Sequence, residues 1–494
     1  MRIQRGGAAI KTILLVLFLI FAAGCVFFNI SDVDIGFHIK TGELIAKERG
    51  IPTRNTFSFT MPDHTWALHQ WAGAFTWYLA NLYGGYKGII MLRVLVFLLT
   101  IGALFLTLNI IDKNYFFFKL ILLTVFALLV RHHFFERPFI FSALFLAILQ
   151  YLVLRDKFRD DAKWLILLLF IVWVQMHAGF IYGILFLALA AVIPRPSRVP
   201  AFAAAGLIAG VWILITINPN GINGILFALN CLFEPLYSRI VAEYQVSNII
   251  TYKLFYATLF SAIVLAAVNR ERLGTGNILI FSAFSVLAVK TNRNILFYAI
   301  VAIPILFDLG IATIKKFPAA ARAISKGLVK YALLVALWAG LLAFVVIPDK
   351  VYCFGFGFYK PFYPSEIFDF IKKNKPRGNI FNDMPLGGPM IWFLYPDYRV
   401  FIDGRFEAYD KAEFWIDDYF HILTTKKGWE DKLNKYNVTM CLLSYGPGEK
   451  EDFIGRVLQN SRDWRIVAFD GYTALFMKDT PENHDIILKV SRDR

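Results

Sequence analysis

Long apolar stretches recur through the first 350 residues of the chain and stop there. Eleven of them predict membrane helices, because about 20 apolar residues span the roughly 30 Å hydrocarbon core of a bilayer. They cover residues 11–30, 88–110, 115–131, 137–154, 164–177, 181–194, 201–217, 251–269, 277–290, 294–312 and 329–347. The short runs 115–131 and 164–177 leave tilted or re-entrant segments open. The chain therefore divides into a membrane part, residues 1–350, and a C-terminal part, residues 351–494.

Strand-like and helix-like segments alternate in the C-terminal part. Strands are expected at Asn379–Asn382, Arg399–Ile402, Val438–Ser444, Arg465–Phe469 and Thr473–Met477, and helices at 364–374, 386–395, 410–435 and 449–460. This alternation predicts a small α/β domain. Asp403-Gly404-Arg405 follows one expected strand, and it is either a turn or part of a ligand site, since ligands bind at the carboxyl ends of strands.

The charge is distributed unevenly between the two parts. The chain is 58% hydrophobic and carries a net charge of +15. Lys and Arg outnumber Asp and Glu by 31 to 15 in residues 1–350, whereas the counts are 20 and 21 in residues 351–494. The excess therefore lies in short loops between apolar helices and not on one folded face, which excludes a nucleic-acid-binding surface. The four cysteines show no CxxC spacing, so neither a disulfide framework nor a zinc site is indicated.

The basic loops also predict the orientation of the chain in the membrane. With a cytoplasmic N-terminus, the inner segments hold 18 Lys and Arg residues in short loops and the outer segments hold 11 over a greater length. This bias fits the positive-inside rule. An odd number of helices then places residues 351–494 on the side of the membrane opposite to the N-terminus. We expect a multi-pass protein of the cell inner (plasma) membrane with an extracytoplasmic C-terminal domain.

Ionisable side chains gather in the outer loops of this topology. The first outer loop, residues 31–87, contains Asp32, Asp34, His38 and Lys40. Later outer loops contain Arg131, Glu136, Arg137, His177 and Arg293. A transporter is expected to bury ionisable residues near the middle of the membrane, and apart from Arg93 and Asp308 the predicted helices hold few. The pattern therefore favours polar chemistry at the outer face of the membrane.

These residue types suit the transfer of a lipid-linked group. Asp32 and Asp34, with the third acid Glu136, could hold a divalent cation such as Mn²⁺ or Mg²⁺, or take a proton from an acceptor. Basic side chains at the headgroup level can stabilise a leaving phosphate, and the candidates are Lys40, Arg131, Arg137 and Arg293. Each of these residues, taken singly, could instead snorkel or cap a helix at the interface.

The spacing of Asp34, His38 and Lys40 after a first membrane helix resembles the first outer loop of the GT-C superfamily of polytopic glycosyltransferases. That superfamily includes oligosaccharyltransferase catalytic subunits, protein O-mannosyltransferases and aminoarabinose transferases. The sequence is more closely similar to a bacterial branch with the patterns D-x-D-x-x-x-H-x-x-x-G, I-P-x-x-D-x-F-S-x-T and H-E-W. These patterns stand here at 32–42, 51–60 and 69–71, with Asn55 and Gln70 in place of two acids. Further matches lie at 136–138, 177–180, 218–221, 293–294 and 400–405.

The resemblance implies an α-helical polytopic GT-C-like enzyme. It would move a sugar or glycan from a polyprenyl-phosphate-linked donor to a lipid, glycan or protein acceptor of the cell envelope. By this resemblance Asp34, Asp32 and Glu136 are the catalytic acids, with Asp34 and Glu136 as metal ligands if a metal is used. Substrate contacts are expected from His38, Lys40, Arg131, Arg137, His177 and Arg293. We also expect Asp34, Glu136 and His177 to border one cavity, with Arg293 at its rim.

A second hypothesis remains open. Asn55 and Gln70 stand where the resembling sequences carry acids, and either position could serve a metal or a general base. If both mark a lost active site, the chain is a non-catalytic membrane protein that binds or presents a lipid-linked glycan to other enzymes.

Overall fold

The structure is a computed structural model that describes residues 2–62, 64–156, 160–191, 210, 218–221, 242–317, 329–346, 353–405, 408–409, 413–445 and 453–492. The chain forms two compact units. Unit 1 comprises Met1–Asn29 and Lys87–Phe356, and unit 2 comprises Ile30–Tyr86 and Gly357–Arg494.

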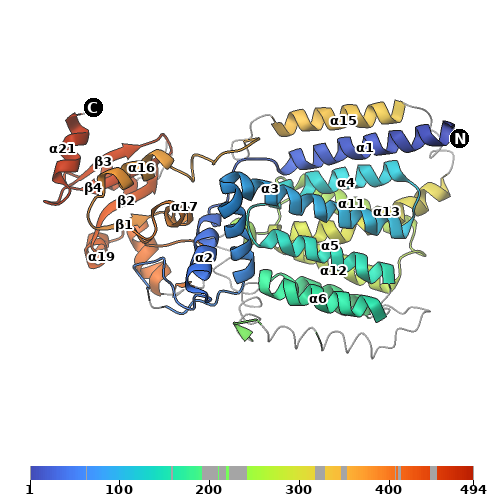
Figure 1. Cartoon of the computed structure of the whole chain (residues 1–494), viewed down its shortest axis with the longest axis horizontal. Coiled ribbons are helices and arrows are strands. Elements are labelled where there is room, and N and C mark those ends of the chain that lie inside the picture. Colours follow the sequence, from blue (N-terminus) through green and yellow to red (C-terminus); the bar gives the residue numbers. More distant parts are fainter. Residues whose placement is uncertain are drawn as a thin grey trace. The chain divides into compact units, whose positions relative to one another are not determined.

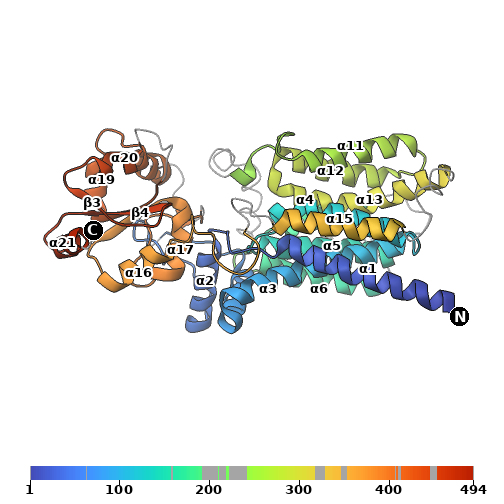
Figure 2. The ribbon, with the colours of Figure 1, turned by 90° about the horizontal axis from the view of Figure 1, so that it is seen from above.

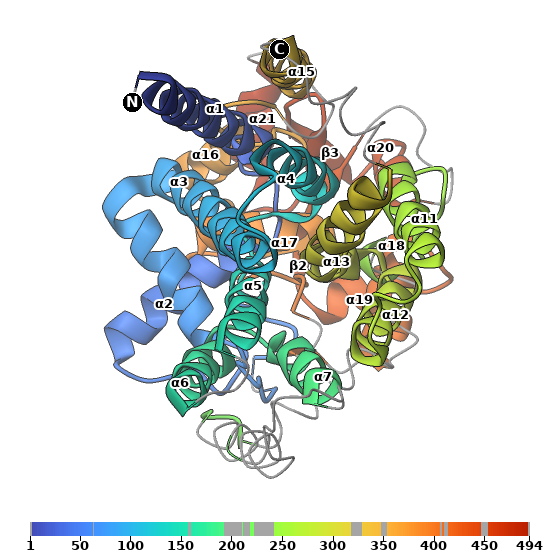
Figure 3. The ribbon, with the colours of Figure 1, turned by 90° about the vertical axis from the view of Figure 1, so that its right-hand side faces the viewer.

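Unit 1 is built from apolar helices that Figure 3 shows roughly end-on. They are α1 (Arg2–Val26), the part of α3 (Trp71–Ile111) that follows Lys87, α4 (Phe116–Val130), α5 (Phe139–Asp156), α6 (Asp160–Met176), α7 (Phe180–Ala191), α11 (Lys253–Val268), α12 (Thr275–Lys290), α13 (Ile295–Lys316) and α15 (Val329–Val346). Single 3-10 turns lie at Arg131–His133, Ala242–Tyr244 and Asn292–Asn294. Helix α13 packs against α4, α5, α11 and α12, and it is apolar on all sides because neighbours cover it all round.

Four described stretches are long and apolar enough to cross a membrane. They are Ala8–Val26, Trp71–Ile111, Phe116–His133 and Asn292–Lys316. The helices α5, α6, α7, α11, α12 and α15 are apolar over shorter lengths. A helix lies at each of the other ten predicted stretches, with ends that differ from the prediction, while the predicted helix 201–217 is described only at residue 210. Helix α3 is kinked at Gly85, where φ is +56°, close to the point where the chain passes from one unit to the other.

Unit 2 contains a four-stranded sheet in the order β1-β2-β4-β3. The strands are β1 (Asn379–Asn382), β2 (Val438–Ser444), β3 (Trp464–Phe469) and β4 (Thr473–Lys478). The β1–β2 pair is parallel, and the other two pairs are antiparallel. The helices are α2 (Ile35–Glu48), α16 (Ser365–Asn374), α17 (Met384–Leu394), α18 (Phe420–Leu423), α19 (Trp429–Lys435), α20 (Ile454–Gln459) and α21 (His484–Arg492), with a π-helical segment at Glu413–Tyr419. Figure 2 shows α19 and α20 on one side of the sheet and α16 on the other.

Most of the predicted first outer loop and most of the C-terminal part fold together as unit 2, which differs from the expected division at residue 350. The backbone explains the difference. Val400 pairs with the loop, since its amide donates to Phe57 O at 3.0 Å and its carbonyl accepts from the amide of Phe59 at 3.2 Å. Helix α2 of the loop also packs on α17, as Figure 1 shows. Segments that are far apart in the sequence therefore belong to one compact unit.

Two C-terminal elements differ from their prediction. The expected strand Arg399–Ile402 forms only an isolated bridge, between Val400 and Ser58. The Asn382 amide takes the place of a ladder there, accepting from the amide of Phe401 at 2.9 Å and donating to Ile402 O at 2.8 Å. The expected helix 410–435 is interrupted between α18 and α19, where Gly428 adopts a φ of +84°.

Glycines allow α2 and α17 to touch backbone to backbone. A Cβ on Gly388 would lie 1.8 Å from Val33 O, and one on Gly36 would lie 2.0 Å from Gly388 O. Backbone atoms cannot move aside as a flexible side chain can. Only glycine therefore permits this approach.

We predict that Gly388→Ala lowers the stability of the protein by roughly 1–3 kcal/mol, because the added methyl group forces α2 away from α17. Gly84→Ala is the matched control, since nothing lies within 4 Å of a Cβ at that helical position. Thermal unfolding of the purified full-length protein measures both variants. Equal melting temperatures for wild type and Gly388→Ala would contradict the close approach.

Candidate functional site

A polar cavity of about 210 Å³ opens in unit 1. Its lining comes from the turn after α4, the start of α5 and the turns before α11 and α13, and it consists of His132, His133, Phe135, Arg137, Phe139, Ile140, Glu243, Tyr252, Asn292 and Arg293. Two predicted substrate-binding residues, Arg137 and Arg293, are thus brought together although they lie far apart in the sequence. We call this the arginine cavity.

Glu243 contributes a negative charge to the lining of the arginine cavity. Arg137 Nη1 lies 2.8 Å from Glu243 Oε1 and 3.0 Å from Oε2, and the Glu243 side chain is 31% exposed. Burial would raise the pKa of the Glu243 carboxyl, but the charges of Arg137 and Arg293 outweigh it and hold that pKa below its usual value of 4.5. Arg137 therefore pairs directly with Glu243, while Arg293 acts on the same carboxylate through its charge.

Aromatic rings hold Arg293 in place. Its guanidinium lies 4.8 Å from the ring centre of Phe139 and 4.8 Å from that of Tyr244, and it donates to the Tyr244 hydroxyl. Rings on two sides restrict the guanidinium while leaving its edge available for an anion. This arrangement can bind a phosphate group.

Two apolar hollows follow the arginine cavity along α11. One, of about 460 Å³, is lined near the start of the helix by Ile249, Lys253 and Tyr256, and the other, of about 340 Å³, reaches Leu273 and Asn277. Both include Leu259 and Ile263, so they adjoin each other on α11, and we call the two together the apolar track. Tyr252, which lines the arginine cavity, directly precedes α11. A polar pocket followed by an apolar track suits a molecule with a charged head and a hydrocarbon tail.

Glu136, predicted as a catalytic acid, makes a buried ion pair. Its carboxylate accepts from Arg93 of α3, and both side chains are 0% exposed. The same guanidinium donates to Phe28 O and lies 3.8 Å from the centre of the Phe28 ring. Glu136 is not among the residues that line the arginine cavity. Arg93 of α3 thus connects the segment after α1 with the segment before α5.

His177 and Arg131 also lie in packed surroundings. The His177 Nδ1 accepts from the Gly179 amide at 2.8 Å and lies 3.0 Å from the Ser142 hydroxyl. Its ring meets Phe139 edge-on at 5.7 Å, so His177 stands behind a wall of the arginine cavity. Arg131 is 7% exposed and caps α4, while its neighbours His132 and His133 line the cavity instead.

Asp32 and Asp34 lie in unit 2 at the start of α2. The Asp34 amide donates to Asp32 Oδ1 at 2.7 Å, and the Asp32 carbonyl accepts from the Tyr363 hydroxyl. Asp34 is half-buried, and its carboxylate lies where a Cβ on Gly404 would come within 2.2 Å of Oδ1. The Asp403-Gly404-Arg405 motif therefore makes room for the Asp34 carboxylate.

The other two predicted residues of this loop lie on α2. His38 is 2% exposed and packs against Phe37, with 4.2 Å between ring centres. Lys40 Nζ lies 2.8 Å from Glu43 Oε2. Because Asp34 belongs to unit 2 while Glu136 and His177 belong to unit 1, a cavity shared by all three stays a prediction.

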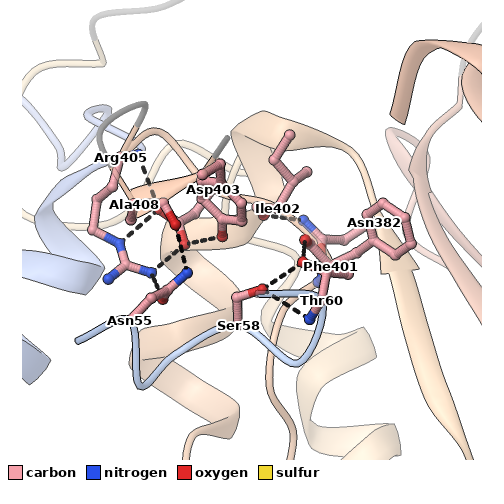
Figure 4. A network of polar contacts seen from close by, with 10 residues as sticks. Asn55, Ser58, Thr60, Asn382, Phe401, Ile402, Asp403, Arg405 and Ala408 are labelled. Carbon is pink, nitrogen blue, oxygen red and sulfur yellow. Dashed lines mark hydrogen bonds and ion pairs between the residues drawn. The ribbon is translucent and has the colours of Figure 1, made fainter. Parts of the chain in front are cut away.

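Figure 4 shows the polar network around Arg405. Arg405 and Asp403 form an ion pair at 2.6 Å with both side chains 0% exposed. Arg405 Nη2 also donates to Asn55 Oδ1 at 3.0 Å, and Asn55 Nδ2 donates to Ala408 O at 2.9 Å. The guanidinium lies 4.6 Å from the ring centre of Trp66. Asn55 thus uses both ends of its amide, which a carboxylate could not do.

The divalent cation suggested by the sequence stays a prediction. No group of three or more His, Cys, Asp or Glu side chains there could hold a metal ion. Asp34 and Glu136, the two proposed ligands, belong to different units.

Sequence reasoning overlooked the partners that organise the arginine cavity. Glu243 was visible only as an isolated acid in a long outer loop, and Phe139 and Tyr244 as ordinary apolar and aromatic residues. A chemical argument could have pointed to Glu243. Two arginines that bind the same phosphate repel each other when it is absent, and a nearby carboxylate offsets that repulsion.

Comparisons with solved structures identify the fold. No protein-family model and no curated protein matches the chain. The archaeal oligosaccharyltransferase AglB from Archaeoglobus fulgidus, in complex with an inhibitory peptide and a dolichol-phosphate, aligns with 96% of this chain and 75% of its own at a TM-score of 0.63 and 11% identity. A complex of the oligosaccharyltransferase from Archaeoglobus fulgidus with Zn and sulfate aligns with 87% of this chain and 68% of its own, at a TM-score of 0.54 and 13% identity.

A transferase from a bacterium shows the same likeness over nearly its whole length. ArnT from Cupriavidus metallidurans in the apo state aligns with 96% of this chain and 98% of its own, at a TM-score of 0.52 and 12% identity. Both kinds of neighbour are GT-C transferases, so the predicted GT-C fold is confirmed. At these identities the likeness establishes the fold, and function must be argued from the site.

We predict that Glu136 stabilises the fold and has no catalytic role. Glu136→Ala should lower stability by about 3–5 kcal/mol, because it leaves the Arg93 charge buried without its counter-ion. The double change Arg93→Met with Glu136→Met should recover much of that loss, since no charge then remains. Thermal unfolding of the wild type, Glu136→Ala and the double variant measures the loss and its recovery. A fully stable Glu136→Ala protein that has lost activity would instead make Glu136 a catalytic group.

We also predict a pH signature for Glu243. Because its folded-state pKa is depressed, the ion pair with Arg137 stabilises the protein above pH 4.5 and is lost as the pH falls through the folded value. Glu243→Gln should therefore cost about 1 kcal/mol at neutral pH, since the pair is partly exposed. The difference in melting temperature between wild type and variant should shrink below pH 4.5. A difference that is independent of pH would contradict the ion pair.

Proposed function

We propose that this protein is a membrane glycosyltransferase. It moves a sugar or glycan from a polyprenyl-phosphate-linked donor to an acceptor on the extracytoplasmic face of the inner membrane. The observation that carries the proposal is the arginine cavity and its apolar track within a GT-C fold. The dolichol-phosphate named with AglB is a ligand of the same chemical kind, a phosphate on a polyisoprenoid tail.

The donor binds by its phosphate in the arginine cavity. Arg137 and Arg293 bind the phosphate oxygens, and Glu243 keeps both cations in position until the donor arrives. The tail follows the apolar hollows along α11. When the bond between sugar and phosphate breaks, the two guanidinium groups stabilise the negative charge that develops on the leaving phosphate.

Asp34 activates the acceptor in this proposal. It is half-buried, whereas Asp32 is 3% exposed and uses its carboxylate to accept from the Asp34 amide. Asp34 therefore takes the proton from the acceptor as the new glycosidic bond forms, and Asp32 positions it. Glu136 stays paired with Arg93 as a structural acid.

The buried network around Asn55 bears on the alternative of a protein that only presents a lipid-linked glycan. That alternative reads Asn55 as a lost catalytic acid. Since Asn55 Oδ1 accepts from Arg405 and Nδ2 donates to Ala408 O, its amide has a structural reason to be there. The departure at this position therefore does not favour the non-catalytic alternative.

We predict that Asp34→Asn reduces glycosyl transfer at least about 100-fold, because the amide cannot accept the acceptor proton. Expression, melting temperature and binding of polyprenyl phosphate should stay at wild-type levels. Glu48→Gln, an exposed acid on the same helix, is the matched control and should leave transfer unchanged. Transfer is measured with purified protein in detergent and a radiolabelled lipid-linked sugar pool.

Undiminished transfer by Asp34→Asn would remove Asp34 from the mechanism. Tight binding of polyprenyl phosphate by the wild type without transfer from any donor pool would support the presenting protein instead.

A further inference from the structure

We propose that unit 2 carries a second binding site, a basic groove that holds an anionic glycan. The groove measures about 570 Å³ and lies beside the start of the edge strand β1. The lining side chains that matter are Phe59, Lys372, Lys375, Arg377, Asp397 and Arg399. The proposal rests on the proposed function and names its acceptor class, a glycan that bears carboxylate or phosphate groups.

Two chain segments form the walls of the basic groove. One wall begins where α16 ends in a left-handed residue, Lys375, with φ of +46°, and it continues through a turn to β1. The other wall is the segment 396–399 that follows α17. The Tyr398 hydroxyl donates to Pro376 O at 2.9 Å and ties the two walls together. The groove is therefore a built feature and not a gap between independent loops.

The charge of the basic groove is one-sided. Lys372, Lys375, Arg377 and Arg399 are exposed and face a single acid, Asp397. Over residues 351–494 the counts of basic and acidic residues are 20 and 21, so this excess is local. Within the described part of the chain, none of the four cations is ion-paired with a carboxylate. Four exposed cations around one acid predict an anionic ligand with several charges.

An aromatic ring makes a glycan the favoured occupant. Phe59 is half-buried in the lining and is held by Phe401, whose ring centre lies 5.8 Å away at 78°. A sugar ring can lie on such an apolar face while its acidic groups reach the surrounding cations. The groove is also concave, whereas the headgroups of a bilayer present a broad flat surface. These features together favour a chain-like anionic glycan over a membrane surface.

The test compares two labelled probes on the full-length protein in detergent. Fluorescence anisotropy measures binding of a fluorescein-labelled oligogalacturonate, with a neutral maltooligosaccharide of the same length as control. Wild type should bind the anionic probe and not the neutral one. The triple change Lys375→Gln, Arg377→Gln and Arg399→Gln should weaken binding about tenfold, as three exposed charge contacts are lost. Lys373→Gln, an exposed lysine of α16 outside the lining, is the matched control and should change nothing.

Other outcomes overturn the inference. Equal binding by wild type and the triple variant at an unchanged melting temperature would exclude the groove, as would equal losses in the triple variant and Lys373→Gln. If the triple variant loses binding to vesicles containing phosphatidylglycerol but keeps binding to the glycan, the groove is a membrane contact instead. A wild type that binds the glycan but never transfers sugar would overturn the proposed function alone, whereas normal transfer with no glycan binding would overturn only the groove.

Discussion

The buried ion pair between Asp403 and Arg405 is the interaction on which unit 2 depends. Both side chains are fully buried, and Arg405 also holds Asn55 of the first outer loop. A buried charge is costly without full compensation, and here the carboxylate, the Asn55 amide and the ring of Trp66 supply it. Compensation of the Arg405 charge therefore requires residues from two distant parts of the sequence at one place in unit 2. That requirement keeps the loop carrying Asp34 folded against the C-terminal part.

The charged side chains of unit 1 are compensated in two different ways. Arg93 and Glu136 neutralise each other completely inside the unit, which is how a helical membrane protein can tolerate them. Arg137, Arg293 and Glu243 are balanced only in part, with two cations on one half-buried carboxylate. The first set serves structure, and the second, with two cations and one acid, carries a net positive charge beside the start of the apolar track. The proposed donor site follows from that difference.

The pattern of apolar and polar residues predicted those helices and strands that depend on local periodicity. The strands Asn379–Asn382 and Val438–Ser444 lie where they were expected, and the apolar segments are helical wherever the structure describes them. The strand at Arg399–Ile402 failed because a single side chain, Asn382, replaces its backbone partner. Arg137 and Arg293 were identified as candidates, but Glu243 between them was not. Long-range partners of this kind leave no periodic signal in one sequence.

A structure of the protein with a bound polyprenyl phosphate tests the proposed donor site most directly. We predict that the phosphate oxygens lie within about 3.2 Å of both Arg137 and Arg293, with the tail along α11. The carboxylate of Glu243 should then have released the guanidinium group of Arg137. A phosphate bound elsewhere, with Arg137 still paired to Glu243 and no lipid in the apolar track, would contradict the proposed donor site.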